Sequence, residues 1–286
     1  MSVSACILAE RKTSGLQKCL KSLDGCVDEI ILGAPDPCLL NGICSRSNVR
    51  VVRIQWKNSF ADARNDLIRH AKSTHILSID SDECMRGSLK GKKLSAQLYL
   101  IKRHNSGKKG FKTRINARDN IREFQSAFTE MLPRIFRKDS FSYLGRIHEE
   151  LVSSYDSKAK DQAIKPVILS NVSIIHTGYS DRDTVHEKFR RNMRLLRLEL
   201  IDCPERKAVH YFMARNYFNQ ALCSSESGTE KELSRLLKKA SSELERYYSA
   251  RGKDKWSEDA GRLSAVLAFS GRADARKALL RLKPYA

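Results

Sequence analysis

The chain has 286 residues, of which 41% are hydrophobic and 30% are charged. This balance excludes a disordered chain, and no apolar run is long enough to span a membrane. No charged-then-apolar segment with a small-residue cleavage site opens the sequence, so we expect no signal peptide and a soluble cytoplasmic protein. The eight cysteines form no CxxC pair and no zinc-finger spacing with histidine, which is typical of buried thiols in a reducing compartment.

The charge of the chain is unevenly distributed. Fifty-three Lys and Arg against 33 Asp and Glu give a formal net charge of +20. Residues 86–138 alone hold 15 basic and 3 acidic residues, a local excess of +12. A positive field of this size attracts polyanions such as nucleic acid, an anionic membrane surface or phosphorylated glycans.

The first eighty residues alternate between strand and helix periodicity. Short apolar runs predict strands over residues 3–8, 29–32, 50–54 and 75–79. Apolar residues at helical spacing predict helices over residues 16–23 and 60–71. This alternation predicts a parallel, doubly wound sheet, in which ligands bind beyond the carboxyl ends of the strands.

The rest of the chain changes character near residue 180. Residues 106–121 are rich in Gly and Lys and predict a loop, while residues 128–136 and 166–175 predict strands. From residue 180 the apolar spacing is helical to the end of the sequence. We therefore expect an α/β domain over residues 1–179 and a helical extension over residues 180–286, which is a candidate packing or homodimer surface.

Two acidic residues directly follow the fourth predicted strand. Asp80 and Asp82 are separated by Ser81 and followed by Glu83. Carboxylates two residues apart at a strand end can face one cleft, and they suit Mg²⁺ or Mn²⁺, which can bridge a diphosphate. The spacing therefore indicates a metal and nucleotide site after the fourth strand.

Two histidine-containing segments supply further candidates. In residues 145–150 (GRIHEE) a carboxylate beside His148 can take a proton from an attacking hydroxyl or thiol. The alternative for this segment is a helix start with exposed charges. In residues 174–179 (IIHTGY) His176 can complete an oxygen-based metal site, or it has a structural role.

Two arginines are candidates for contacts with an anionic ligand. Arg64 lies in FADARN at a predicted helix start, where backbone amides and the guanidinium suit a phosphate or the nucleotide. A helix cap with a surface arginine is the alternative. Arg134, in the segment PRIFR, can neutralise a diphosphate leaving group.

Together these motifs resemble the family 2 glycosyltransferases with the GT-A fold. The resemblance is greatest to the branch with a helical, tetratricopeptide-like C-terminal extension, which includes bacteriocin peptide glycosyltransferases. The resemblance implies an α/β GT-A fold, Rossmann-like with a mostly parallel sheet, followed by α-helices. The motifs run in the family's order over residues 1 to about 200: Ala9-Glu10, 27–31, Trp56, 59–65, 79–83, 133–137, 145–151 and 175–179.

The resemblance also implies a reaction and a set of residues. It implies metal-dependent, inverting transfer of a sugar from a nucleotide donor, commonly a UDP-sugar, to a hydroxyl-type acceptor. Mn²⁺ or Mg²⁺ would be held by Asp80, Asp82 and His176, and the base would come from the His148–Glu149 pair, where we favour Glu149. The expected nucleotide-sugar-binding residues are Ala9, Glu10, Asp36, Arg64, Asp80, Ser81 and Arg134.

The sequence departs from the family pattern in two loops. Ala34 lies where the family usually has a nucleotide-binding Asp after the second strand, and Asp36 follows two positions later. The first loop reads Ala9-Glu10-Arg11-Lys12 in place of the usual Lys-Asn-Glu pattern. Recognition of the base is therefore expected to differ, and UDP is an expectation from the family.

The family resemblance and the charge of the chain point to different acceptors. Family likeness implies a peptide or glycan, whereas the basic segment favours a polyanion, whose binding is steeply salt-dependent. The first hypothesis is a modified, hydroxymethylated base in DNA, which must be flipped out of a duplex. The alternatives are an anionic lipid-linked glycan, a peptide Ser or Cys, or a catalytically decayed polyanion-binding module. The expected acceptor-binding residues are Lys108, Lys109, Lys112 and Arg114.

Overall fold

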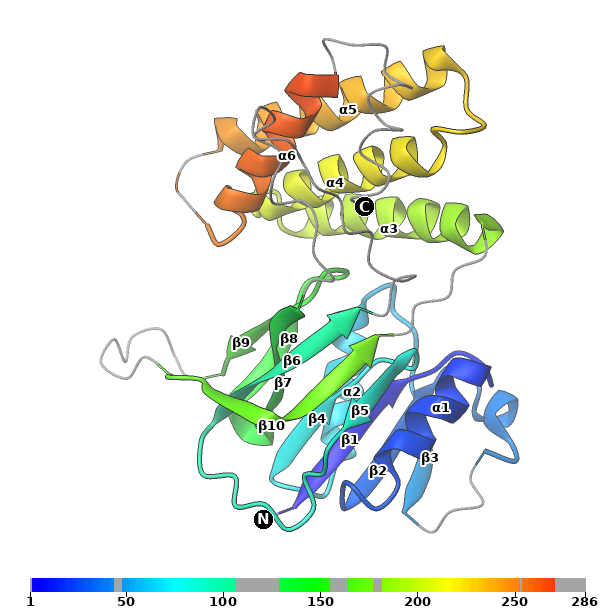
Figure 1. Cartoon of the computed structure of the whole chain (residues 1–286), viewed down its shortest axis with the longest axis vertical. Coiled ribbons are helices and arrows are strands. Elements are labelled where there is room, and N and C mark those ends of the chain that lie inside the picture. The colour runs from blue at the N-terminus through cyan, green and yellow to red at the C-terminus, as the bar shows by residue number, and fades with distance from the viewer. Residues whose placement is uncertain are drawn as a thin grey trace, which may run out of the picture. The chain divides into compact units, whose positions relative to one another are not determined.

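The protein contains two compact units (Figure 1). The computed structural model describes residues 2–43, 48–105, 129–154, 164–176, 182–250, 252 and 254–270. The described residues up to 176 form the first unit, and those from 182 onward form the second. Among the helices of these ranges, none combines the length and the apolar character needed to cross a bilayer.

The first unit is built on a mixed β-sheet. Its elements are β1 (Val3–Leu8), α1 (Ser14–Leu23), β2 (Glu29–Ala34), β3 (Val49–Arg53), α2 (Phe60–Arg69), β4 (His75–Ser78), β5 (Glu83–Arg86), β6 (Leu98–Asn105), β7 (Thr129–Arg137), β8 (Phe141–Leu144), β9 (Glu150–Ser153) and β10 (Val167–His176), with 3₁₀ helices at Pro37–Leu40 and Lys138–Ser140. Eight strands pair in the order β3-β2-β1-β4-β7-β6-β10-β5, and β8 pairs with β9 in a separate hairpin. The pairs β1–β2, β2–β3, β1–β4 and β6–β10 are parallel. The pairs β4–β7, β6–β7 and β5–β10 are antiparallel.

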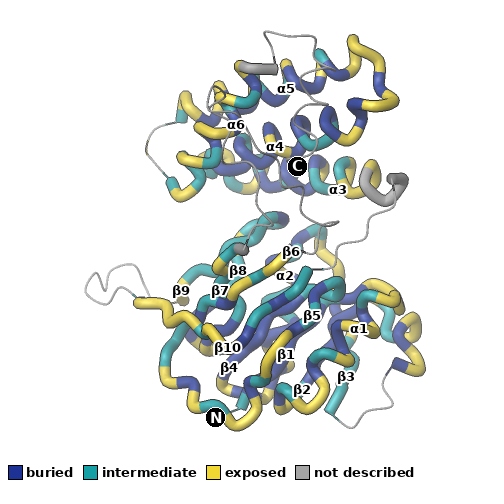
Figure 2. Tube along the Cα trace, in the orientation of Figure 1, coloured by how far each residue is buried: buried dark blue, intermediate teal, exposed yellow. Residues whose placement is uncertain are grey.

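The two faces of the sheet bury separate apolar clusters. Successive side chains of a strand point to opposite faces, so Val3, Ala5 and Ile7 of β1 join the cluster that contains the apolar face of α1. Cys6 points the other way, into the cluster formed with α2 and the β8–β9 hairpin. The central strands β1, β2 and β4 are consequently buried almost throughout, as the dark segments of Figure 2 show. Strands covered on both faces are typical of α/β proteins.

Side-chain caps fix the start of both helices of this unit. The Thr13 hydroxyl accepts a hydrogen bond from the Leu16 amide at 3.1 Å at the start of α1. The Ser59 hydroxyl does the same for the Asp62 amide at 3.0 Å at the start of α2. Such caps satisfy amides that have no partner within the helix, and losing one costs about 1 kcal/mol.

The described residues of the second unit form four consecutive helices: α3 (Arg182–Asp202), α4 (Ala208–Cys223), α5 (Glu230–Ser249) and α6 (Ser257–Ser270). Each helix packs on the next one in the chain. Polar contacts join them: the Asn216 side chain donates to the Phe189 carbonyl at 3.2 Å, and His210 Nδ1 lies 2.8 Å from Glu243 Oε2. Trp256 stacks on Tyr211 with ring centroids 5.7 Å apart.

The predicted fold class, an α/β domain with a mostly parallel sheet followed by helices, is confirmed. The strands and helices predicted in the first eighty residues are present, and so are the strands predicted near residues 128–136 and 166–175. The sheet is mixed and not wholly parallel, because β7 pairs antiparallel with β4 and β6, and β5 pairs antiparallel with β10. The strands β5, β6, β8 and β9 were not predicted. Residues 145–149 form an irregular connection between β8 and β9 without a helix, so the predicted alternative of a helix start is wrong.

Candidate active site at the carboxyl edge of the sheet

Strand direction brings most of the predicted site residues to one edge of the sheet. Because β1, β2 and β4 are parallel, their carboxyl ends lie at the same edge. Asp80 follows β4 by two residues, and His176 is the last residue of β10. The antiparallel register places His176 opposite Glu83, the first residue of β5. The turn at residues 80–83 therefore lies beside the end of β10.

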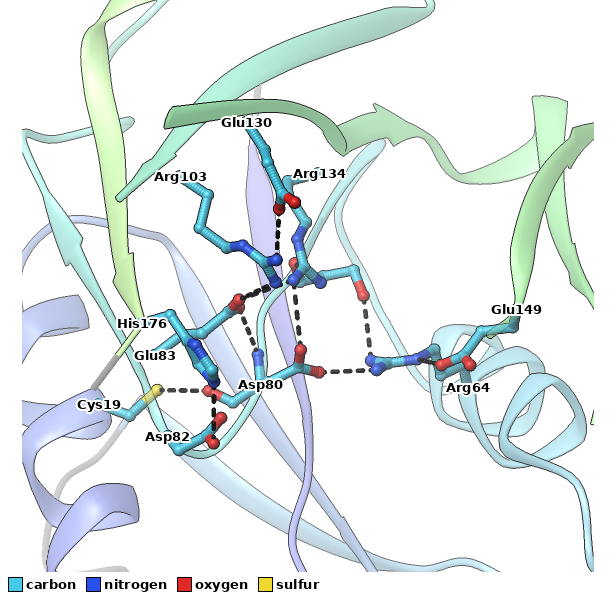
Figure 3. A network of polar contacts seen from close by, with 11 residues as sticks. Cys19, Arg64, Asp80, Asp82, Glu83, Arg103, Glu130, Arg134, Glu149 and His176 are labelled. Atoms are coloured by element: carbon cyan, nitrogen blue, oxygen red, sulfur yellow. Dashed lines mark hydrogen bonds and ion pairs between the residues drawn. The ribbon is translucent and has the colours of Figure 1, made fainter. Parts of the chain in front are cut away.

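The Asp80 carboxylate lies between two arginines (Figure 3). Arg64 donates from Nη2 to Asp80 Oδ1 at 2.6 Å, and Arg134 donates from Nη2 to Asp80 Oδ2 at 3.2 Å. Burial alone would raise the pKa of Asp80, but the two guanidinium groups outweigh it and hold that pKa well below the usual range. Asp80 is therefore ionised at neutral pH, with both oxygens bound.

Local backbone structure aims each arginine at this carboxylate. Arg64 lies one helical turn after Phe60 at the start of α2, and its side chain is 13% exposed. In β7, Pro133 pairs with Leu100 and Ile135 pairs with Tyr99, so Arg134 is the extra residue of a β-bulge. Bulges tolerate proline and redirect side chains, which accounts for a buried arginine pointing at the turn after β4.

Glu83 extends this network to the neighbouring strands. Its Oε2 accepts the Asp80 backbone N–H at 3.0 Å, and its Oε1 accepts Arg134 Nη2 at 2.7 Å. Arg103 of β6 lies 3.5 Å from the same Oε1 and also pairs with Glu130 of β7. Burial raises the pKa of Glu83, and Arg134 opposes that shift. The result is one continuous series of ion pairs, Glu149–Arg64–Asp80–Arg134–Glu83–Arg103–Glu130.

Asp82 and His176 form a separate contact beside this network. His176 Nε2 lies 3.2 Å from Asp82 Oδ2, and both side chains are partly exposed. The hydrogen bond from His176 lowers the pKa of Asp82, and the same bond raises the pKa of His176. One carboxylate and one imidazole fit a divalent cation such as Mn²⁺ as a pair of ligands.

The expected three-residue metal set is only partly assembled. Both Asp80 oxygens bind arginines, so its carboxylate does not turn to the Asp82–His176 pair (Figure 3). Within the described ranges no group of three or more His, Cys, Asp or Glu side chains is arranged to hold a metal ion. The physical reason is that two buried guanidinium groups compete for Asp80. The residues that fit a cation are therefore Asp82 and His176.

Glu149 reaches the same edge through the loop between β8 and β9. Its Oε1 accepts Arg64 Nε at 2.6 Å, so one guanidinium joins Glu149 to Asp80. The preceding residue, His148, has a positive φ of 52°, a conformation that costs energy for a residue with a Cβ atom and that often occurs at functional sites. The structure thus brings Glu149 to Arg64, while His148 supplies the turn that directs it there.

Two residues that were not given a site role fix the position of this loop. The Asn65 side chain donates to the Tyr143 carbonyl at 2.9 Å and accepts the Tyr143 N–H at 2.8 Å, which attaches β8 to α2. Arg146 donates to the carbonyls of Lys57 and Asn58 at 3.3 and 3.1 Å. Adjacent residues of the ARN motif therefore have different tasks, since Arg64 binds carboxylates and Asn65 binds a strand.

The remaining predicted nucleotide-binding residues lie nearby with other contacts. Ala9 is buried after β1, and its N–H donates to the Gly33 carbonyl at 2.9 Å, whereas Glu10 is exposed. Asp36 caps a 3₁₀ helix by accepting the Cys38 N–H at 3.0 Å. Ser81 lies in the turn between Asp80 and Asp82. The predicted acceptor residues, Lys108, Lys109, Lys112 and Arg114, lie outside the described residues.

Sequence reasoning gave no role to Glu83 or to Arg103. Glu83 belongs to the DSDE motif and lies three residues after Asp80. At this spacing its side chain can accept a hydrogen bond from the Asp80 backbone N–H, which is the feature of the sequence that could have indicated its role. Arg103 and its partner Glu130 come from β6 and the start of β7, where the sequence contains no motif. These residues meet only because the two strands are adjacent in the sheet.

A mostly parallel α/β sheet with paired carboxylates after its fourth strand, followed by helices, is the arrangement that the GT-A resemblance implies. No family model matches the chain. Over 223 residues, 75% of the chain, the sequence is 26% identical to the SPbeta prophage-derived glycosyltransferase SunS of Bacillus subtilis (strain 168) and to Glycosyltransferase SunS of Bacillus phage SPbeta. The expected relationship to glycosyltransferases is thereby confirmed as a distant one. The chain spans about half the length (49%) of these curated relatives.

Solved structures of S. aureus TarS 1–349 are also similar to the chain. The structure in complex with UDP has a TM-score of 0.43 at 13% identity, covering 99% of this chain and 90% of that one. The structure without UDP has a TM-score of 0.40 at 12% identity with the same coverage.

Proposed function

We propose that the protein is a glycosyltransferase that moves a sugar, with inversion at C1, from a nucleoside diphosphate donor to an acceptor. The distant sequence relationship to SunS supports the reaction class. The single observation that carries the location of the site is the convergence of Arg64, Asp80, Arg134 and Glu149 in one hydrogen-bonded network, beside the Asp82–His176 contact. A UDP-sugar is the first donor to test, and the boundary near residue 180 is proposed as the end of the transferase domain.

Each residue of the site has a proposed role. The Glu149 carboxylate accepts the proton of the acceptor hydroxyl as its oxygen bonds to C1 and the bond from C1 to the donor diphosphate breaks. Arg64 orients Glu149 through the 2.6 Å hydrogen bond. Arg134 and Arg64 hold Asp80, which directs the turn at residues 80–83 toward the nucleotide. Ala9, Glu10, Asp36 and Ser81 are proposed contacts to the nucleotide sugar.

A divalent cation is proposed to be part of this site. Asp82 and His176 would hold Mn²⁺ or Mg²⁺, which stabilises negative charge on a diphosphate leaving group. Asp80 is assigned to the arginines instead of to the cation, because both of its oxygens are hydrogen-bonded to guanidinium groups.

The substitution Asp82→Asn tests the cation. Mn²⁺-dependent binding of UDP, measured by titration calorimetry with and without chelator, should be lost in this variant because the amide is a poor ligand for a hard cation. Asp66→Asn on α2 is a matched control, since Asp66 pairs with the exposed Arg69 and belongs to no part of the proposed site. Equal affinity of Asp82→Asn and wild type, in the presence of Mn²⁺, would refute the assignment.

The substitution Glu149→Gln tests the base. Donor binding should persist, and transfer should fall by about 10²-fold or more, because the amide cannot accept the acceptor proton. The assay is a screen of nucleotide sugars with Mn²⁺ followed by mass spectrometry of candidate acceptors. Transfer within a few-fold of wild type would place the base elsewhere, with His148 next to test.

A polyanionic acceptor is proposed from the charge of residues 86–138. A hydroxymethylated base in DNA is the first acceptor to test, and an anionic lipid-linked glycan and a peptide Ser or Cys are the others. Binding to DNA and to anionic liposomes is compared over a salt titration, because each neutralised phosphate steepens the salt dependence. If the protein binds neither DNA nor anionic liposomes, a peptide is the remaining acceptor to test. Neutralising Lys108, Lys109 and Lys112 together should weaken only polyanion binding.

A further inference from the structure

Glu83 is a buried carboxylate that the proposed reaction does not use. Its side chain has 0% exposure, and it accepts hydrogen bonds from three donors on three different segments. Those donors are the Asp80 backbone N–H in the turn after β4, Arg134 on β7 and Arg103 on β6. A fully buried carboxylate is rare unless it is paired, and these contacts explain why it is tolerated.

The contacts of Glu83 reach both halves of the proposed donor site. Oε2 holds the Asp80 N–H and so fixes the start of the turn that ends at Asp82. Oε1 holds Arg134, which in turn binds the Asp80 carboxylate. The backbone of Glu83 lies opposite His176 in the β5–β10 pair. Glu83 is therefore also adjacent to the strand that carries His176, the partner of Asp82.

The chemistry of the site requires a carboxylate at this position. A carboxylate only accepts hydrogen bonds, and each Glu83 oxygen faces a donor. A glutamine has one oxygen and one NH₂ group, so its NH₂ must face either the Asp80 N–H or the Arg134 guanidinium, whichever way the amide is turned. In Glu83→Gln, either the Asp80 N–H or the Arg134 guanidinium therefore loses its hydrogen-bond acceptor.

Resting on the proposed function, we propose that Glu83 is a positioning residue for the donor. It holds the turn at residues 80–83 and Arg134 in one fixed arrangement, so that Asp82 and His176 share one side of the site and the arginines share the other. Arg103 is the outer support of Glu83 and is itself paired with Glu130.

The test compares two glutamate-to-glutamine substitutions in the same series of ion pairs. Glu83→Gln acts at the buried centre, and Glu130→Gln acts at an end whose side chain is 43% exposed. Each arginine that loses Glu83 keeps a second acidic partner, Asp80 for Arg134 and Glu130 for Arg103, so no cation is left unpaired. The probe is UDP with Mn²⁺, and its Kd is measured by titration calorimetry together with the melting temperature.

Glu83→Gln should raise the Kd of UDP with Mn²⁺ at least about tenfold, the effect of losing a hydrogen bond to a charged group, while Glu130→Gln should change it less than about twofold. A purely structural role would reduce the fraction of folded protein and leave the Kd of that fraction unchanged. If Glu83→Gln is not soluble, Glu83→Asp replaces it, because the shorter side chain cannot reach both donors. A rise below about threefold in the folded variant, or an equal rise in both variants, overturns the inference.

A second measurement distinguishes failure of the proposed function from failure of this inference. If wild type binds no nucleoside diphosphate with Mn²⁺, the proposed function is wrong, and the inference is judged by hydrogen exchange of the peptide that contains Asp80. The Asp80 amide should then exchange at least about tenfold faster in Glu83→Gln than in wild type and Glu130→Gln. Equal exchange in all three proteins overturns the positioning role.

Discussion

Replacing Arg64 by methionine should destabilise the first unit by about 3–5 kcal/mol, the cost of leaving a buried charge without its partner. Methionine keeps an unbranched apolar stem similar to that of arginine, so the change removes mainly the guanidinium. Asp80 keeps Arg134, but Glu149, whose side chain is 14% exposed, loses the guanidinium at 2.6 Å. For a unit of this size the loss corresponds to a decrease in melting temperature of roughly 6–20 °C.

The assay is thermal unfolding followed by circular dichroism, with a matched control on the same helix. Arg69→Met removes an arginine whose side chain is 70% exposed and which pairs with Asp66, so it should cost less than about 1 kcal/mol. Adding Glu149→Gln to Arg64→Met removes the stranded charge and should restore about 2 kcal/mol. Equal losses in Arg64→Met and Arg69→Met, or strict additivity in the double variant, would refute the reasoning.

Two further predictions concern the packing around the site. A Cβ atom on Gly15 of α1 would lie 3.3 Å from the Ser81 carbonyl oxygen. Gly15→Val should therefore lower the free energy of unfolding by about 1–3 kcal/mol, and Gly15→Ala should lower it much less. Urea unfolding measures this, and a valine variant as stable as wild type would contradict the prediction. Burial raises the pKa of Cys6 to about 12, so its thiolate fraction at pH 9 is about 10⁻³, and iodoacetamide should label exposed Cys38 long before Cys6 in the native protein. Mass spectrometry of the labelled sites checks this, and equal labelling rates at pH 9 would show that Cys6 is accessible and ionised.

The elements that could be predicted from the sequence are those with a short apolar run or a clear helical period. The strand β1, which is buried on both faces, is a short apolar run, and the amphipathic helix α1 buries one face whose apolar residues recur at helical spacing. The strand β6 (LYLIKRHN) could not be recognised in this way, because its second half is polar. Its Arg103 is accommodated by acidic partners that come from other parts of the chain, and a local pattern does not contain that information.

The same limit applies to the site. Asp80, Asp82 and His176 could be selected because each follows or ends an apolar strand, and the carboxyl ends of strands gather at one edge. The partner of Asp80 could not be deduced, since it depends on a β-bulge that turns Arg134 toward it. A bulge is a property of two paired strands, and it becomes visible only when their register is known.

Under the proposed function, the charge balance at the edge of the sheet has a consequence for the order in which the cation and the donor bind. Five carboxylates (Asp80, Asp82, Glu83, Glu130 and Glu149) and three arginines (Arg64, Arg103 and Arg134) leave a formal charge of −2 there, or −1 when His176 is protonated. A chain with an overall charge of +20 thus carries a locally anionic cluster of side chains where the proposed function places an anionic donor. Electrostatic repulsion disfavours entry of a bare diphosphate, so binding in which the cation arrives first, or already chelated by the nucleotide, is the expected kinetic route.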